Sequence, residues 1–140
     1  MFLLDTNILS AVMGTRPVPK VANWMEEQPP DILFTAAVCQ AEILSGITVL
    51  PKGRRREALE IAALAMFRED FAGRILPFDT EAAVIYAELF ALRRSAGRPA
   101  ATVDLMIASI ARAHGASVVT RDTGDFEGCG LALINPWSAS

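Results

Sequence analysis

The sequence predicts an α/β domain in which helices cover both faces of a parallel β-sheet. Short apolar runs bounded by turn residues alternate with longer segments rich in alanine, leucine, glutamate and arginine. The short runs are typical of buried strands and the longer segments of helices. Such alternation favours a parallel sheet. Because 140 residues match the usual size of one domain, we expect a single domain over residues 1–140.

Five strands are predicted from these apolar runs. They are Met1–Leu4, Ile32–Thr35, Arg74–Phe78, Ser117–Thr120 and Leu131–Asn135. Pro77 lies in the third run and has no backbone N–H to donate to a neighbouring strand. We therefore expect the third strand at an edge of the sheet.

Five longer helices are predicted between the strands. They are Pro19–Gln28, Ala36–Val49, Arg54–Phe71, Thr80–Ala96 and Thr102–His114. Asp79 and Thr102 are expected to cap the last two of these helices. A further short helix through Met13 is expected to be capped by Thr6 or Asn7, which would leave Asp5 free for another role.

The composition excludes several classes of protein. Hydrophobic residues make up 52% and charged residues 21% of the chain, which excludes intrinsic disorder. The longest apolar run, Ile61–Phe67, is too short to span a membrane, and no basic stretch precedes Phe2 as in a secretory signal. Cys39 and Cys129 lack CxxC spacing, and His114 is the only histidine, so no zinc set is expected. We therefore expect a cytoplasmic protein with reduced thiols.

Acidic side chains gather where a ligand site is expected. Ligands of open α/β sheets bind beyond the carboxyl ends of the strands, and Asp5 and Asp122 each follow a strand there. The candidates are Asp5, Glu42, Asp104, and Asp122 or Asp125. Each also has a structural explanation, such as a helix dipole for Asp104 or solvent exposure for Glu42. Gly46, one turn after Glu42, suits close approach by a ligand or by backbone.

Clustered carboxylates repel each other, and a divalent cation removes that cost. Mg²⁺ prefers oxygen ligands and bridges to phosphate, and such a site can generate hydroxide for phosphodiester hydrolysis. The net charge of −3 excludes nucleic-acid binding by counterion release alone. The basic run Lys52–Arg56 is a candidate contact for RNA or a protein partner. Trp24 and Trp137 have no basic neighbour in sequence and are expected to pack.

Several of these motifs together resemble the PIN domain. They are Asp5-Thr6-Asn7, Ala41-Glu42 with Gly46, Asp104, and Thr120-Arg121-Asp122. The chain looks most like the VapC-type toxins of bacterial toxin–antitoxin pairs, in their FitB-like branch. The branch resemblance includes the segment 71–79 and the terminal Asn135-Pro136-Trp137, so it covers essentially the whole chain.

The resemblance implies a PIN-like doubly wound sheet with strand order 3-2-1-4-5 and a single PIN domain over residues 1–140. It implies an endoribonuclease dependent on Mg²⁺ or Mn²⁺, with RNA as substrate, a cognate antitoxin and a homodimer. The acidic cluster, catalytic and metal-binding, would be Asp5, Glu42, Asp104 and Asp122. Asn7 and Thr120 would be accessory polar groups, and Asp125 could replace Asp122. The resemblance leaves open whether one or two metal ions bind.

Two other functions remain as alternatives. One is an aspartyl-phosphate phosphotransfer domain that uses Asp5, which needs a lysine near the later strands. The chain has lysine only at Lys20 and Lys52, so this alternative has little support. The other is a non-catalytic metal- or protein-binding module whose carboxylates are structural. The apolar run 61–67 favours a covering partner, because a helix that is apolar all round must be covered.

Overall fold

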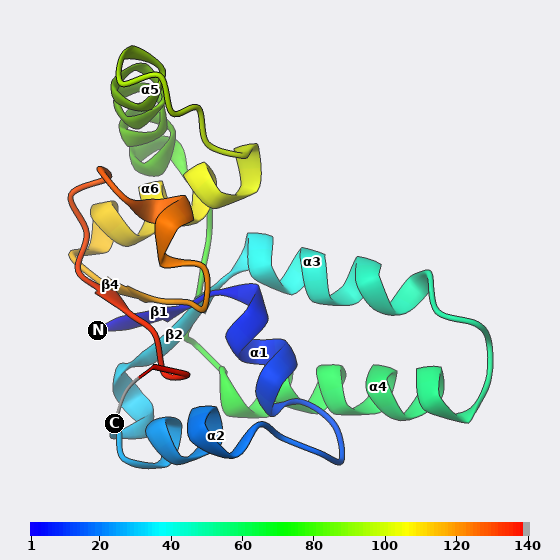
Figure 1. The fold of residues 1–140 in the computed structure, drawn as a ribbon. Coiled ribbons are helices and arrows are strands. Elements are labelled where there is room, and N and C mark those ends of the chain that lie inside the picture. The colour runs from blue at the N-terminus through cyan, green and yellow to red at the C-terminus, as the bar shows by residue number, and fades with distance from the viewer. Residues whose placement is uncertain (139–140) are drawn as a thin grey trace.

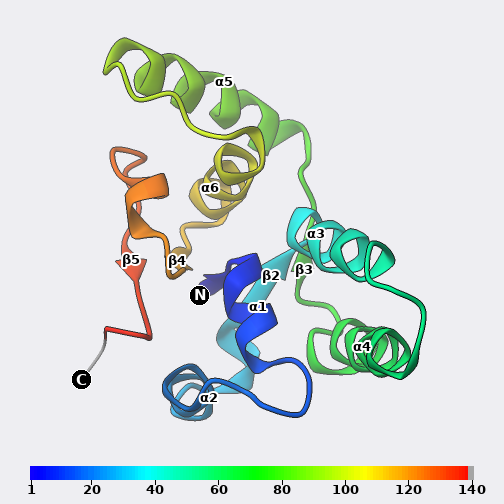
Figure 2. The same ribbon diagram turned by 45° about the vertical axis from the view of Figure 1, so that its right-hand side comes forward.

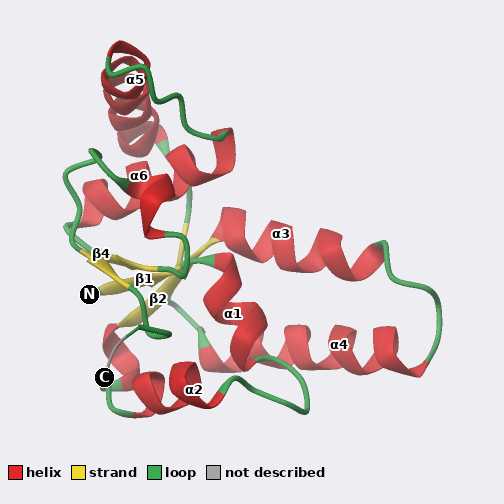
Figure 3. Cartoon of the chain, viewed as in Figure 1, coloured by secondary structure: helices red, strands yellow, loops and turns green. Residues whose placement is uncertain are grey.

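A five-stranded parallel sheet forms the centre of the protein (Figures 1 and 3). The computed structural model describes residues 1–138. The strand order is β3-β2-β1-β4-β5, which confirms the predicted α/β fold and its 3-2-1-4-5 order. The strands are β1 (Phe2–Leu4), β2 (Leu33–Ala36), β3 (Ile75–Leu76), β4 (Ser117–Val119) and β5 (Leu133–Ile134). The short β3 precedes Pro77 and lies at an edge, as predicted.

Helices pack against both faces of this sheet. They are α1 (Thr6–Val12), α2 (Pro19–Glu26), α3 (Ala37–Thr48), α4 (Arg54–Ala65), α5 (Thr80–Ser95) and α6 (Thr102–His114), with short helical turns at Pro30–Ile32, Met66–Asp70 and Thr123–Phe126. Figure 1 shows α5 and α6 above the sheet and α2 and α4 below it. In Figure 2, α3 and α4 run together as a hairpin that projects from the sheet. No helix in residues 1–138 is long and apolar enough to cross a bilayer.

The central strands are buried on both faces because helices cover both sides. Leu3 and Leu4 of β1 and Val118 and Val119 of β4 are all fully buried. Leu4 pairs with Val119 in parallel register, and the Asp5 backbone N–H continues the ladder by donating to the Val119 carbonyl at 2.9 Å. The residues that follow β1 and β4 therefore lie side by side at the carboxyl edge of the sheet.

The helix caps agree only in part with the predictions. Asp79 caps α5, because its Oδ1 accepts from the Ala82 N–H at 2.9 Å. The prediction for Thr102 was wrong, since α6 already begins at this residue and Ala101 is the N-cap without a side-chain hydrogen bond. The prediction for α1 was also wrong: Asp5 itself is the N-cap and accepts from the Thr6 N–H. The side chains of Thr6 and its neighbour are thereby free for other contacts.

The predicted helix over 54–71 ends as an α-helix at Ala65 and continues as a π-helical turn. The Phe71 N–H donates to the Met66 carbonyl at 3.0 Å, five residues back. Met66, Phe67 and Phe71 are all buried. Ile61, in contrast, is 71% exposed, so one side of this helix is uncovered in the chain by itself.

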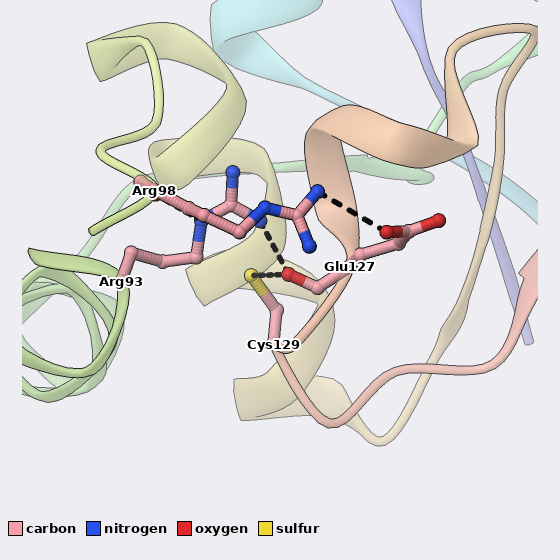
Figure 4. Close-up of polar contacts among 4 residues, drawn as sticks. All are labelled: Arg93, Arg98, Glu127 and Cys129. Carbon is pink, nitrogen blue, oxygen red and sulfur yellow. Dashed lines mark hydrogen bonds and ion pairs between the residues drawn. The ribbon is translucent and has the colours of Figure 1, made fainter. Parts of the chain in front are cut away.

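A buried arginine joins three segments on the α5 side of the molecule (Figure 4). Arg93 of α5 is only 7% exposed. Its Nε donates to the Arg98 carbonyl at 2.7 Å, and its guanidinium also donates to the Glu127 carbonyl. The Arg98 side chain pairs with the Glu127 carboxylate at 3.2 Å, and buried Cys129 lies alongside. This Arg93 cluster fixes the chain before α6 and the loop after residue 126 to α5.

Candidate functional site

Asp5 forms the floor of the site at the junction of β1 and α1. Its side chain is held from two sides, because Oδ1 accepts from the Thr6 N–H and Oδ2 accepts from the Thr120 hydroxyl, both at 2.8 Å. Asp5 is only 6% exposed and Thr120 is fully buried. Burial raises the pKa of Asp5, the two hydrogen bonds lower it, and the charges of Glu42 and Asp122 raise it further. Its capping role does not remove Asp5 from the site.

Glu42 reaches the site from α3, which packs beside α1. The Thr6 hydroxyl donates to Glu42 Oε1, so Thr6 links the second carboxylate to the start of α1. This role of Thr6 was not predicted from the sequence, although its place beside Asp5 was a signal for it. A Cβ added at Gly46 would meet nothing within 4 Å. The space that a side chain at Gly46 would occupy is therefore open.

Asn7 and Thr120 connect the carboxylates that follow β1 and β4. The Asn7 amide donates to Asp122 Oδ2 at 3.2 Å, to the Thr120 hydroxyl oxygen at 3.3 Å and to Asp5 Oδ2 at 3.4 Å. The Asp122 N–H in turn donates to the Thr120 hydroxyl oxygen at 3.0 Å. Neutral donors therefore hold two acidic side chains near each other without neutralising their charge.

Asp104 completes the cluster from the first turn of α6. Its side chain is half-buried, and burial is the main reason why its pKa rises to about 6. The charges of Asp5, Asp125, Glu42 and Asp122 each raise it further. A carboxylate with this pKa has too little positive charge around it, which is typical of a site that takes a cation.

The four predicted acidic residues meet at one cleft of about 540 Å³. Its lining consists of Asp5, Thr6, Asn7, Ser10, Ala11, Val18, Glu42, Asp104, Arg121, Asp122 and Trp137. Asp125 is not part of this lining, but its charge still raises the pKa of Asp104. Arg121 brings the one positive charge among these lining residues, and no separate role was predicted for it from the sequence.

The donor set suits a hard divalent cation. Carboxylate oxygens dominate the cleft, and hydroxyl and amide groups of Thr6, Asn7 and Ser10 surround them. Within residues 1–138, no three acidic, histidine or cysteine side chains already enclose a single point as direct ligands. Mg²⁺ commonly keeps several waters and uses only one or two carboxylates, so an open acidic cleft of this kind fits it.

Other singled-out residues lie outside the cleft. His114 is exposed at the end of α6. Cys39 is fully buried in α3, and burial raises the pKa of its thiol to about 12. Cys39 and Cys129 are both free and buried. The basic run Lys52–Arg56 lies at the turn between α3 and α4 and at the start of α4. Arg56 pairs with Glu60 at 2.9 Å. Contact of this run with RNA or a protein partner stays a prediction.

Comparison with known proteins places this geometry in a family. The PIN domain model matches residues 2–128. The plasmid stability protein StbB of Pseudomonas syringae pv. tomato is 41% identical over 139 residues, which cover 99% of this chain and 100% of that protein. The VapC ribonuclease Y4jK of Sinorhizobium fredii is 38% identical, with 98% of both chains covered. Toxin FitB of Neisseria gonorrhoeae is 35% identical and covers 98% of this chain and 99% of its own.

The same relationship appears in three dimensions. The structure of FitAB bound to an IR36 DNA fragment superimposes with a TM-score of 0.92 at 34% identity, over 100% of this chain and 98% of that chain. The match therefore extends over the sheet, the helices and the cleft together. The chain belongs to the PIN domain family, in the branch that includes the VapC and FitB toxins.

Proposed function

We propose that this protein is a metal-dependent endoribonuclease that acts as the toxin of a toxin–antitoxin pair. The observation that carries the proposal is the meeting of Asp5, Glu42, Asp104 and Asp122 in one cleft. The names of relatives support it, because they include a VapC ribonuclease, a toxin and, at 29% identity, the tRNA(fMet)-specific endonuclease VapC of Shigella flexneri. A hydrolase of RNA phosphodiester bonds is the function that joins both observations.

Mg²⁺ or Mn²⁺ would be held in the cleft by one or two of the four carboxylates directly and by the others through bound water. A bound divalent cation supplies a water of lowered pKa and neutralises charge on a phosphodiester as it reacts. Asp5 and Asp104 provide the less exposed oxygens, while Glu42 and Asp122 stand exposed at the sides. Thr120 and Asn7 orient Asp5 and Asp122, as outer partners of metal ligands commonly do.

The test is cleavage of a mixed pool of structured RNA by the purified protein, with and without Mg²⁺ or Mn²⁺. We expect cleavage that requires the added cation and disappears in Asp5→Asn. Asp31→Asn is the matched control, since Asp31 is exposed in the turn before β2, outside the cleft lining. Equal metal-dependent cleavage by Asp5→Asn and the control would contradict the assignment.

The aspartyl-phosphate alternative gains no support from the site. Both oxygens of Asp5 already accept hydrogen bonds. Among residues 1–138, no lysine lines the cleft, and Lys20 donates to the Trp137 carbonyl at 3.2 Å.

We also propose an antitoxin partner and a homodimer. A structural neighbour is FitAcB of Neisseria gonorrhoeae, at a TM-score of 0.87 and 32% identity. In this chain, large apolar side chains remain exposed on three helices: Leu44 on α3, Ile61 and Leu64 on α4, and Val84, Phe90 and Leu92 on α5. Light scattering should show a dimer, and a monodisperse monomer at high concentration would contradict self-association.

We further propose that residues 1–140 form one PIN domain that works in the cytoplasm. The matched family region, residues 2–128, spans all but the last strand. The two free cysteines suit a reducing compartment. Limited proteolysis that releases two stable fragments would contradict the single domain.

A further inference from the structure

Within residues 1–138, Arg121 is a cation at an acidic cleft that has no acidic partner. It lies directly after Thr120 and lines the same cleft as the four carboxylates. Coulomb attraction favours an ion pair between such groups. Yet the ion pairs in residues 1–138 are Arg56–Glu60 and Arg98–Glu127, and Arg121 takes part in neither.

The Arg121 guanidinium instead lies over the indole ring of Trp137, with its central carbon 5.2 Å from the ring centroid. A cation over the face of a tryptophan ring is attracted by the ring's quadrupole. Trp137 is half-buried and packs against the core, so it provides a fixed surface. The expectation that Trp137 only packs was therefore incomplete, because a basic residue distant in sequence lies against it.

Both residues are held through their backbones. The Arg121 N–H donates to Asn7 Oδ1 at 3.2 Å, and the Arg121 carbonyl accepts from the Asn135 amide at 3.3 Å. The Trp137 N–H donates to Asn135 Oδ1 at 3.0 Å. Asn135 thus joins the end of β4 to the chain after β5 and sets the arginine against the ring.

Because Arg121 stacks on Trp137, its guanidinium and the carboxylates of the cleft both remain available to ligands. Within the described chain, the guanidinium donates no hydrogen bond, so its N–H groups remain free in the plane of the group. A stacked arginine can still offer paired N–H donors to a phosphate. The carboxylates likewise keep their oxygens for a cation, because the arginine does not occupy them.

We propose that Arg121, held on Trp137, binds a phosphate of the RNA strand beside the bond that is cleaved. This inference rests on the proposed ribonuclease function and adds a substrate contact to it. Arg121 is exposed at the rim, whereas Asp5 is buried at the floor. The contact therefore holds a phosphate that does not react, and it binds ground state and transition state alike. Loss of such a contact raises KM and leaves kcat unchanged.

The test compares Arg121→Gln with wild type on a labelled pool of mixed-sequence single-stranded RNA in Mg²⁺. We expect KM to rise about tenfold, the loss typical of one charged hydrogen-bonding contact, with kcat within about twofold. Arg121→Lys keeps the charge but lacks the paired donors, so its KM should lie between those of wild type and Arg121→Gln. Arg94→Gln is the matched control. It removes the same charge as Arg121→Gln, and Arg94 is exposed on α5 outside the cleft lining.

Trp137→Leu tests whether the ring holds the arginine. This variant keeps an apolar side chain against the core but removes the cation–π contact. We expect KM to rise in Trp137→Leu and to rise no further in Arg121→Gln/Trp137→Leu than in Arg121→Gln alone, because the two residues act as one unit. Additive effects in the double variant would show that Trp137 acts independently and would overturn this part of the proposal.

Binding without cleavage separates this proposal from the function on which it rests. RNA affinity is measured with Asp5→Asn, alone and combined with Arg121→Gln, over a range of salt. The slope of log affinity against log salt concentration should become shallower by about 0.7, the value for one phosphate contact on a single strand.

If wild type cleaves RNA but Arg121→Gln leaves KM and this slope unchanged, the Arg121 contact is wrong and the function stands. A fall in kcat at constant KM also overturns it. If wild type cleaves no RNA but the slope falls as expected, the contact stands and the ribonuclease function is wrong.

Discussion

The acidic cleft and the Arg93 cluster both hold a charged side chain away from solvent, but they do so in opposite ways. Arg93 is 7% exposed and Asp5 is 6% exposed. The guanidinium of Arg93 meets two backbone carbonyls, with the Arg98–Glu127 ion pair alongside. Asp5 accepts three hydrogen bonds from neutral donors, yet its charged neighbours in the cleft include Glu42 and Asp122, which raise its pKa.

The difference separates a structural charge from a functional one. A buried cation that donates to acceptors keeps those acceptors paired, and its removal leaves them unsatisfied. Carboxylates gathered together raise the free energy of the folded state until a cation binds. The fold tolerates that cost in the cleft, where a ligand can offset it, and avoids it at Arg93. We therefore expect removal of the Arg93 charge to lower the stability of the fold, and removal of the Asp5 charge to leave that stability unchanged or to raise it.

The largest expected effect is on catalysis by Asp5→Asn. We expect RNA cleavage to fall by about a thousandfold or more, as for removal of a central catalytic group, because the substituted amide no longer supplies a negative oxygen for a cation. The apo protein should keep its fold and should be at least as stable, since one repelling charge is gone. The measurements are initial cleavage rates and the midpoint of urea unfolding without metal. A marked loss of stability would show that Asp5 is mainly structural.

The next largest effect is on stability at Arg93. In Arg93→Met the carbonyls of Arg98 and Glu127 lose a buried charged donor, and we expect a loss of about 3 kcal/mol in the free energy of unfolding. Thermal melting should fall by roughly 10 °C for a domain of this size. Arg94→Met is the matched control, because the adjacent side chain is exposed, and it should change the free energy by less than about 0.5 kcal/mol. Equal stability of the two variants would contradict a structural role for Arg93.

The stabilisation of the fold by a bound metal ion should depend on the carboxylates of the cleft and not on Arg93. Excess Mg²⁺ should raise the melting temperature of wild type by several degrees, because a ligand at a hundredfold excess over Kd adds about 2.7 kcal/mol. Asp5→Asn/Asp104→Asn should lose this gain, whereas Arg93→Met, although less stable, should keep it. Equal shifts in wild type and Asp5→Asn/Asp104→Asn would place the cation elsewhere.

Much of the fold and of the cleft followed from residues that act locally. Pro77 indicated an edge strand because it lacks an N–H, and the ends of β1 and β4 located Asp5 and Asp122 because parallel strands bring their carboxyl ends to one edge. Family resemblance supplied the strand order and ranked Asp122 above Asp125. That ranking agrees with the cleft lining, although the roles of the acidic residues stay predictions.

The contacts that sequence analysis missed depend on segments far apart in the chain. Thr6 meets Glu42 only because α1 packs beside α3. Arg121 reaches Trp137 because the ends of β4 and β5 are adjacent. Arg93 lies in α5, and no residue near it in sequence indicates which carbonyls its side chain meets. Side-chain partners of this kind follow from tertiary packing and not from local pattern.

The smallest expected effect is a dependence of stability on pH that arises in the cleft. Because the pKa of Asp104 is about 6 in the folded protein, against an ordinary value of 3.8, the folded state binds this proton more tightly than the unfolded chain. Protonation therefore stabilises the fold: the contribution is fully present below about pH 4 and is lost as pH rises through about 6. The raised pKa of Asp5 acts in the same direction. Asp104 is only half-buried, so solvent screening keeps the effect modest.

The measurement is the melting temperature without metal between pH 7 and pH 5, where it should rise as pH falls. Asp104→Asn should show a flatter profile, and Asp31→Asn, with an exposed carboxyl before β2, should follow wild type. With Mg²⁺ present the trend should reverse, because protons then compete with the cation for the same oxygens. A profile in Asp104→Asn identical to that of wild type would show that the carboxylates of the cleft are not coupled as the structure indicates. The Arg93 cluster lies outside the cleft lining, so Arg93→Met should lower the whole profile without changing its slope.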